Sequence, residues 1–215
     1  MKLQMSLDRV DIAAAMEILK STHDVIDIVE VGTPFIFKEG LHAVAAIRRA
    51  YPDVTILADT KIMDGGAYVA AMAAEAGADI VTVLAASEDE TIRNALAAVK
   101  RLGKELLVDM IAIPNLMERA KQVDGWGADY IGVHTGFDIQ ALGASPLEQL
   151  RQLTSVLVHT KPAVAGGIDL DTLPAIVAEQ PAIVICGKSI TRKPDPRQTI
   201  LDMKEIIARG KEAQS

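Results

Sequence analysis

The segment "DTKIMDGG", residues 59–66, places Asp59, Lys61 and Asp64 within six residues of one another. It follows the apolar run "VTIL" after a single alanine, so the charges stand where a buried strand is expected to end. Charges taken out of water are costly unless they compensate one another or a bound charged group. Two acids around one base at such a point therefore indicate chemistry rather than a solvated helix face.

Other ionisable residues follow other apolar runs in the same way, namely Asp8, Glu30, Asp109 and His134. Any one of these acids could simply cap the helix that follows it. A ring of acids repels itself unless a cation lies inside, so the whole set predicts a functional site. Two of them, Glu30 and Asp59, would suit Mg²⁺, which binds a few protein oxygens and keeps other positions for water and substrate. His134 is our candidate general base, because a neutral imidazole accepts a proton near pH 7.

Two later strand ends carry glycines instead, in "AGGID" and "CGKSI". Backbone N–H groups at such turns bind phosphate, and barrels often place a phosphate site after strands seven and eight. We therefore expect Gly166, Gly167, Gly187 and Lys188 to bind a phosphate group. The letters "GKS" do not indicate a nucleotide-binding P-loop, because that motif requires glycine where Ala182 stands.

Eight short apolar runs, separated by segments of helical periodicity, position these residues. The predicted strands are 3–8, 25–32, 54–59, 79–84, 105–110, 129–134, 162–167 and 182–187. Helices are predicted between them, for example over 39–51 and over 87–103 with Ser87 as N-cap. Eight strand–helix units of about 27 residues predict a closed α/β (β/α)8 TIM barrel, a single domain over residues 1–215. An open doubly wound sheet is the alternative, which the regular repetition disfavours.

Composition excludes several classes of function. The net charge of −7 argues against nucleic acid as a partner, because phosphates attract clusters of Lys and Arg. The single cysteine, Cys186, excludes an intramolecular disulfide framework and fits a reducing compartment. We see no signal peptide and no apolar run of the roughly 20 residues that span a membrane. The expectation is a cytoplasmic protein without a membrane partner.

The chain resembles the orotidine 5′-monophosphate decarboxylase superfamily, whose Asp-x-Lys-x-x-Asp signature matches "DTKIMDGG". The resemblance covers nearly the whole chain, through "LQMSLD", "IDIVEVGTPFIFKEG", "LVDMI", "VHTGFD" and "AVAGGI". It is strongest to the 3-hexulose-6-phosphate synthase branch, which joins formaldehyde to D-ribulose 5-phosphate. The 3-keto-L-gulonate-6-phosphate decarboxylase branch is similar at most of the same positions.

This resemblance implies a sugar-phosphate lyase that works as a homodimer of barrels, with its active sites at the interface. It implies that Glu30 and Asp59 ligate Mg²⁺ and that a cis-enediolate intermediate forms. By the same resemblance Lys61 would stabilise the enediolate and Asp64 would enter the partner's site. The resemblance also assigns substrate hydroxyls to Asp8, and we place Asp109 among the substrate-binding residues.

Two other functions stay open on the sequence alone. One is decarboxylation of 3-keto-L-gulonate 6-phosphate, which passes through a similar enediolate. The decarboxylase branch carries arginine three residues after its histidine, where this chain has Phe137, and arginine in place of Lys188. The other is a non-catalytic barrel that only binds sugar phosphate, which the presence of every acid, lysine and histidine of the matched set disfavours.

Overall fold

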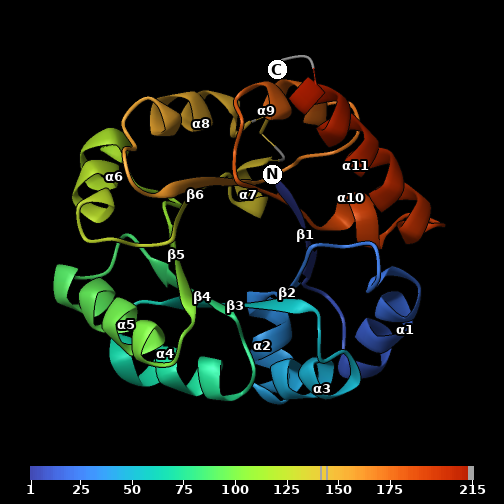
Figure 1. The fold of residues 1–215 in the computed structure, drawn as a ribbon, viewed down its shortest axis with the longest axis horizontal. Coiled ribbons are helices and arrows are strands. Elements are labelled where there is room, and N and C mark those ends of the chain that lie inside the picture. Colours follow the sequence, from blue (N-terminus) through green and yellow to red (C-terminus); the bar gives the residue numbers. More distant parts are fainter. Residues whose placement is uncertain (141, 144, 213–215) are drawn as a thin grey trace.

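The computed structural model describes residues 1–140, 142–143 and 145–212, and its strands close into one parallel barrel in the order β1 to β8 (Figure 1). The strands are β1 (Lys2–Leu7), β2 (Ile28–Val31), β3 (Thr55–Ile62), β4 (Ile80–Leu84), β5 (Glu105–Asp109), β6 (Tyr130–His134), β7 (Lys161–Ala165) and β8 (Ile183–Cys186). Each pairs with its sequence neighbours, and β1 pairs with β8 to close the ring. The predicted (β/α)8 barrel is confirmed.

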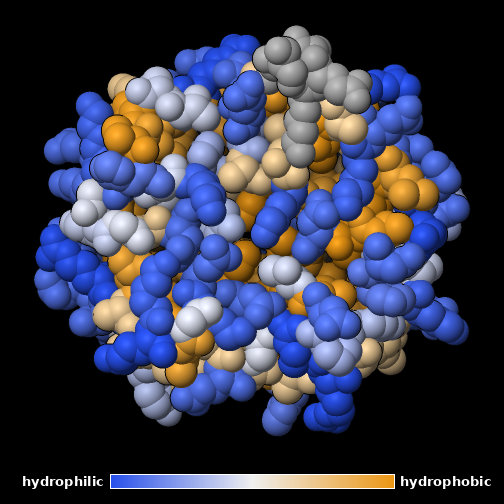
Figure 2. Space-filling view, in the orientation of Figure 1, coloured by the Kyte–Doolittle hydropathy of each residue, from blue (hydrophilic) through white to orange (hydrophobic). Residues whose placement is uncertain are grey.

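The helices lie mostly in an outer ring around the strands, as Figure 1 shows. They are α1 (Ile12–Thr22), α2 (Thr33–Glu39), α3 (His42–Ala50), α4 (Gly66–Glu75), α5 (Asp89–Arg101), α6 (Leu116–Asp124), α7 (Phe137–Gln140), α8 (Leu147–Thr154), α9 (Leu173–Ala178), α10 (Lys188–Thr191) and α11 (Pro196–Glu212). On the face drawn in Figure 2, hydrophilic side chains cover most of the surface and hydrophobic ones lie between them. No helix in the part of the chain that the structure describes is long and apolar enough to cross a membrane.

All eight predicted strands are present, but three local expectations need correction. Strand β3 does not end at Asp59; it continues to Ile62 and carries the Asp-x-Lys pair within it. Helix α2, which begins after Gly32, was not predicted. Helix α5 begins at Asp89 with Glu88 as its N-cap, because the Ser87 hydroxyl donates instead to the Leu84 carbonyl oxygen.

A small apolar layer fills the barrel below the strands' carboxyl ends. It comprises Ile28, Leu57, Ile80, Leu107, Tyr130, Ala163 and Ile183, one residue from each of seven strands. Side chains alternate along a strand, so the inward position two residues further on lies one layer higher. That rule takes Ile28 to Glu30, Leu57 to Asp59 and Leu107 to Asp109. The apolar layer is therefore the floor on which the polar site is built.

Three aspartates fix the register of the strands at the opposite end of the barrel. Asp27, Asp79 and Asp129 stand directly before β2, β4 and β6, and each accepts a backbone N–H at the start of the preceding strand. Each also pairs with a lysine, which for Asp79 is Lys104 at 2.7 Å. Register matters because a shift by one residue would turn every inward side chain outward.

Candidate active site

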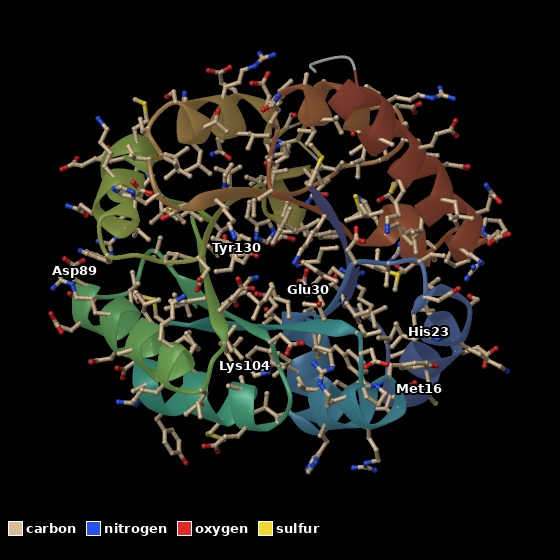
Figure 3. All side chains as sticks on the ribbon, viewed as in Figure 1. Met16, His23, Glu30, Asp89, Lys104 and Tyr130 are labelled. Atoms are coloured by element: carbon tan, nitrogen blue, oxygen red, sulfur yellow. The ribbon has the colours of Figure 1, made fainter. Side chains whose placement is uncertain are left out.

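A cavity of about 780 Å³ opens at the carboxyl ends of the strands. Every predicted site residue except Asp64 lines it, namely Asp8, Glu30, Asp59, Lys61, Asp109, His134, Gly166, Gly167, Gly187 and Lys188. Glu30, labelled in Figure 3, lies toward the middle of the ring of strands, whereas Asp89 lies at the periphery. Residues from seven of the eight strand ends or the loops after them thus share one cavity, as the sequence predicted.

The Lys61 ammonium lies between two buried carboxylates. Its Nζ donates to Asp59 Oδ2 at 2.6 Å and lies 3.5 Å from Asp109 Oδ2. Burial acts to lower the pKa of Lys61, but the charges of Asp59 and Asp109 outweigh it and raise the pKa. Lys61 is therefore a permanent cation near neutral pH.

The backbone of Lys61 is held in an uncommon conformation to place that ammonium. Its φ is 45°, in the left-handed region that non-glycine residues seldom adopt. The pairing of β3 with β4 shifts register between Ala58 and Ile62, and the Lys61 N–H donates to Thr82 Oγ1 at 3.0 Å. Strained backbone of this kind persists only where surrounding contacts hold it, and it clusters at functional sites.

Asp59 is oriented by hydroxyl groups as well as by Lys61. Thr82 Oγ1 donates to its Oδ1 at 2.9 Å, and Thr33 Oγ1 lies within hydrogen-bond distance of its Oδ2 at 2.8 Å. Thr33 also reaches the Asp59 carbonyl oxygen at 2.7 Å. Asp59 as a whole is 7% exposed, and it lines the cavity. Fixed carboxylates of this kind are what a preorganised site requires.

Asp109 joins the lysine to the histidine. His134 Nδ1 lies 3.0 Å from Asp109 Oδ2, and Asp109 Oδ1 accepts the Ile111 backbone N–H at 2.9 Å. A neutral ring that donates from Nδ1 leaves Nε2 with a free lone pair, the arrangement that a general base needs. Burial acts to lower the pKa of His134, but the hydrogen bond and charge of Asp109 raise it above its ordinary value. Burial likewise acts to raise the pKa of Asp109, and His134 and Lys61 hold it low.

Glu30 is an acid whose ionisation the site strongly opposes. Burial, together with the charges of Asp59 and Asp8, raises the pKa of its carboxyl to about 8. Its Oε2 accepts from Gln4 Nε2 at 2.6 Å, while Gln4 Oε1 is buried and has no hydrogen-bond partner among the described residues. Adjacent carboxyls that resist ionisation are the environment that a cation would relieve.

The donor set fits Mg²⁺ better than metals that need many protein ligands. The described residues contain no cluster of three or more His, Cys, Asp or Glu side chains arranged as a metal site. Mg²⁺ typically takes only one or two carboxylates and keeps several waters or substrate oxygens. The Glu30–Asp59 pair offers two hard carboxylates in the cavity and so meets that requirement.

The opposite side of the cavity is built from glycine backbone and cations. Gly166 and Gly167 have φ of 114° and 70°, and a Cβ on Gly166 would lie 2.5 Å from the Thr135 carbonyl oxygen. Neither position accepts a side chain without strain, and both glycines line the cavity with their backbone. Lys188 lines the same side as the first residue of α10.

Asp64 is the one predicted residue that this chain does not bring to its own cavity. It lies exposed between β3 and α4, where its Oδ1 accepts the Gly65 N–H at 2.7 Å. Sequence reasoning missed Gln4, Thr33, Thr82 and Arg9, which also line the cavity. The signal for Gln4 and Thr82 was present: each is a polar residue on the inward-facing positions of an otherwise apolar strand.

Known proteins that are similar to this chain are named as synthases or decarboxylases of phosphate-bearing compounds. The model of the orotidine 5′-phosphate decarboxylase / HUMPS family matches residues 1–203. A Bacillus subtilis (strain 168) protein named 3-hexulose-6-phosphate synthase is 46% identical over 210 residues, covering 98% of this chain and 100% of that protein. The crystal structure of 3-hexulose-6-phosphate synthase from Salmonella typhimurium matches with a TM-score of 0.95 and 39% identity, over 98% of this chain and 100% of the other. The 3-keto-L-gulonate-6-phosphate decarboxylase structure from Vibrio cholerae O1 matches with a TM-score of 0.86 and 27% identity, over 97% of each chain.

Proposed function

This chain belongs to the orotidine 5′-phosphate decarboxylase / HUMPS family, and we propose that it is a Mg²⁺-dependent 3-hexulose-6-phosphate synthase. The reaction is the aldol addition of formaldehyde to D-ribulose 5-phosphate, giving D-arabino-3-hexulose 6-phosphate through a cis-enediolate. The observation that carries the proposal is the chain of contacts from Asp59 through Lys61 and Asp109 to His134. It sets a proton acceptor and a fixed cation side by side in one cavity.

In the first step His134 Nε2 takes a proton from C1 of ribulose 5-phosphate. The electron pair of that C–H bond passes to the enediolate, and the proton stays on the imidazolium. Asp109 stabilises the imidazolium through Nδ1, which is the physical meaning of the raised His134 pKa. Lys61 lies next to the same carboxylate and offers its charge to the enediolate oxygens as they become negative.

In the second step C1 of the enediolate attacks the carbon of formaldehyde. A C–C bond forms, the formaldehyde C=O becomes an alkoxide, and the imidazolium returns its proton to that oxygen. One proton is thus removed and returned, so the step needs no oxidant or reductant. Asp8, whose pKa is raised chiefly by burial, would accept hydrogen bonds from the sugar hydroxyls beside Ser6.

Glu30 and Asp59 would hold the Mg²⁺. When bound, the ion would make the C1 proton more acidic by polarising the adjacent carbonyl. The chain's own part is to keep the two carboxylates fixed, through Gln4 on Glu30 and Thr82 on Asp59. Lys61 also donates to Asp59, so the ammonium and the ion would both be held by that carboxylate.

We propose a homodimer as the working unit, with Asp64 reaching the partner's cavity. Four large apolar side chains on elements next to β3 are exposed in the single chain: Phe37 (86%), Met63 (54%), Tyr68 (73%) and Met72 (42%). They come from α2, α4 and the loop between β3 and α4. Exposed apolar residues on neighbouring elements favour a protein–protein interface, and a second copy of the chain is the occupant that would also give Asp64 a role.

Decarboxylation of 3-keto-L-gulonate 6-phosphate is the competing reaction. It requires prompt protonation of the enediolate, whereas aldol addition requires the enediolate to persist until formaldehyde arrives. Phe137 lines the cavity three residues after His134 and can neither donate a proton nor orient water by charge. An apolar group at this place favours aldol addition.

The first prediction compares the two reactions in one preparation. Aldol addition should exceed decarboxylation in kcat/KM by at least about tenfold, roughly 1.4 kcal/mol of differential transition-state stabilisation. Formaldehyde consumption with ribulose 5-phosphate and release of CO₂ from keto-gulonate phosphate would be followed separately. Phe137→Arg should narrow the ratio of the two kcat/KM values. Both substrates carry a phosphate group, so a general effect on phosphate binding would change both values and leave their ratio the same. Equal efficiencies in the unmodified protein would contradict the synthase assignment.

The second prediction concerns the metal. Excess EDTA should abolish turnover and Mg²⁺ should restore it, because the proposed ion would use the Glu30 and Asp59 carboxylates to polarise the substrate carbonyl. Glu30→Gln should reduce kcat/KM by at least about a hundredfold, on the order of 3 kcal/mol, while circular dichroism and the urea midpoint stay near those of the unmodified protein. Full turnover in EDTA, after metal analysis shows an apoprotein, would refute the metal requirement.

The third prediction tests the shared site. A Lys61→Ala chain and an Asp64→Ala chain should each be inactive alone, and a mixed dimer should contain one site with both residues intact. After co-refolding we expect up to about a quarter of the unmodified activity, the share expected when half of the dimers are mixed and each has one working site. A mixture of Lys61→Ala and Glu30→Gln chains is the matched control. If both residues act within their own chain, every site of that mixed dimer lacks one of them and no activity should return. Absence of recovery, with mass spectrometry showing mixed dimers, would exclude the role of Asp64.

A further inference from the structure

Two cations lie against one aromatic ring at the mouth of the cavity. The Arg9 guanidinium carbon is 4.8 Å from the Phe137 ring centroid, and Lys188 Nζ is 5.1 Å from it. Arg9 belongs to the loop between β1 and α1, Phe137 begins α7 after β6, and Lys188 begins α10 after β8. The ring therefore joins three loops that are far apart in the sequence, and all three residues line the cavity.

The two cations of this group bring like charges to one aromatic ring. Both cations are exposed, and among the residues that the structure describes no acid forms an ion pair with either of them. A ring face attracts a cation, but it does not cancel the repulsion between two of them. The two cations at the mouth are thus left available for an anion from solution.

We propose that Arg9 is a second side chain that binds the substrate phosphate together with Lys188, and that Phe137 is the positioning residue for both. The inference rests on the proposed function, which supplies a phosphate-bearing substrate. A phosphate dianion would compensate the two like charges, and the planar guanidinium offers paired N–H donors that the Lys188 ammonium lacks. The close-lying backbone of Gly166 and Gly167 lines the same cavity.

Arg9 also lies next to the residue that is assigned to the sugar. Arg9 follows Asp8, the acid assigned to the sugar hydroxyls, so one short loop would contact both the sugar and its phosphate. Gly32 and Gly187 approach Asp8 closely from β2 and β8: a Cβ on Gly32 would lie 2.2 Å from Asp8 Oδ1, and one on Gly187 3.3 Å from Asp8 Oδ2. The loop is therefore confined, and Arg9 has a fixed origin from which to reach the phosphate.

The test is calorimetric titration with inorganic phosphate and, separately, with D-ribulose 5-phosphate without formaldehyde. Arg9→Gln should weaken both by about tenfold, the scale of one charge-assisted hydrogen bond. Arg9→Lys should recover part of the lost phosphate affinity, because lysine restores the positive charge but lacks the paired N–H donors of the guanidinium. Arg49→Gln, an exposed cation on α3 that does not line the cavity, is the matched control and should bind as the unmodified protein does.

Phe137→Leu separates positioning from direct binding. It should weaken phosphate binding by about threefold, and the Arg9→Gln/Phe137→Leu double variant should bind less weakly than the product of the two single losses predicts. Unphosphorylated D-ribulose should not distinguish Arg9→Gln from the unmodified protein. Phosphate binding by Arg9→Gln within twofold of the unmodified protein, or an equal loss in Arg49→Gln, would overturn the proposal. Neither titration needs turnover, so a chain that binds phosphate through Arg9 but adds no formaldehyde would refute the synthase reaction alone.

Discussion

The structure depends on the compensation of charges that are buried at the top of a barrel. Asp59, Asp109 and Glu30 are each at most 7% exposed, and among the residues that the structure describes Lys61 is the one lysine or arginine that forms ion pairs with any of them. Breaking such a group by removing one member leaves a buried charge without a partner, which is strongly destabilising. The local structure is organised around this requirement. The strand bulge and the left-handed backbone at Lys61 carry its ammonium to the two carboxylates, and Thr82 secures both the Lys61 N–H and Asp59.

The same charges divide the cavity into two parts with different chemistry. Acids from β2, β3 and β5 surround Lys61 on one side, where the proposed proton transfer and cation-dependent step would take place. Glycine backbone and the cations Arg9 and Lys188 form the other side, where a dianion would be held. His134 lies between them on β6 and is tied to the acidic part through Asp109. A substrate with a carbonyl at one end and a phosphate at the other fits this division, and it explains why the proposed roles follow the order of the strands.

Much of this arrangement could be predicted from the sequence, because the side-chain period of a strand is a strict constraint. Once Ile28, Leu57 and Leu107 are assigned to the barrel floor, Glu30, Asp59 and Asp109 must point into the cavity above it. The resemblance to a known family added roles to those positions, and family membership is now established. What the sequence could not give were features set by tertiary contacts. The continuation of β3 through Lys61 depends on Thr82 of the next strand. The contact of the exposed Arg9 with Phe137 depends on the fold, which brings the segment after β6 next to the loop after β1. Asp64 stays a prediction, since a single chain does not bring it to a site.

The central claim is that the Asp109–His134 pair, next to Lys61, removes a proton from C1 of the sugar phosphate. The most direct measurement is the exchange of that proton with D₂O, followed by NMR on D-ribulose 5-phosphate with Mg²⁺ and no formaldehyde. The account predicts exchange of a single C1 hydrogen. Its rate should rise with pH through the His134 pKa, above the ordinary value of about 6.5, because only the neutral ring accepts a proton. In Asp109→Asn that rise should move to lower pH and the maximal rate should fall, since the carboxylate that stabilises the imidazolium is gone. Exchange that is independent of pH, or that is unchanged in both Asp109→Asn and His134→Gln, would contradict the account.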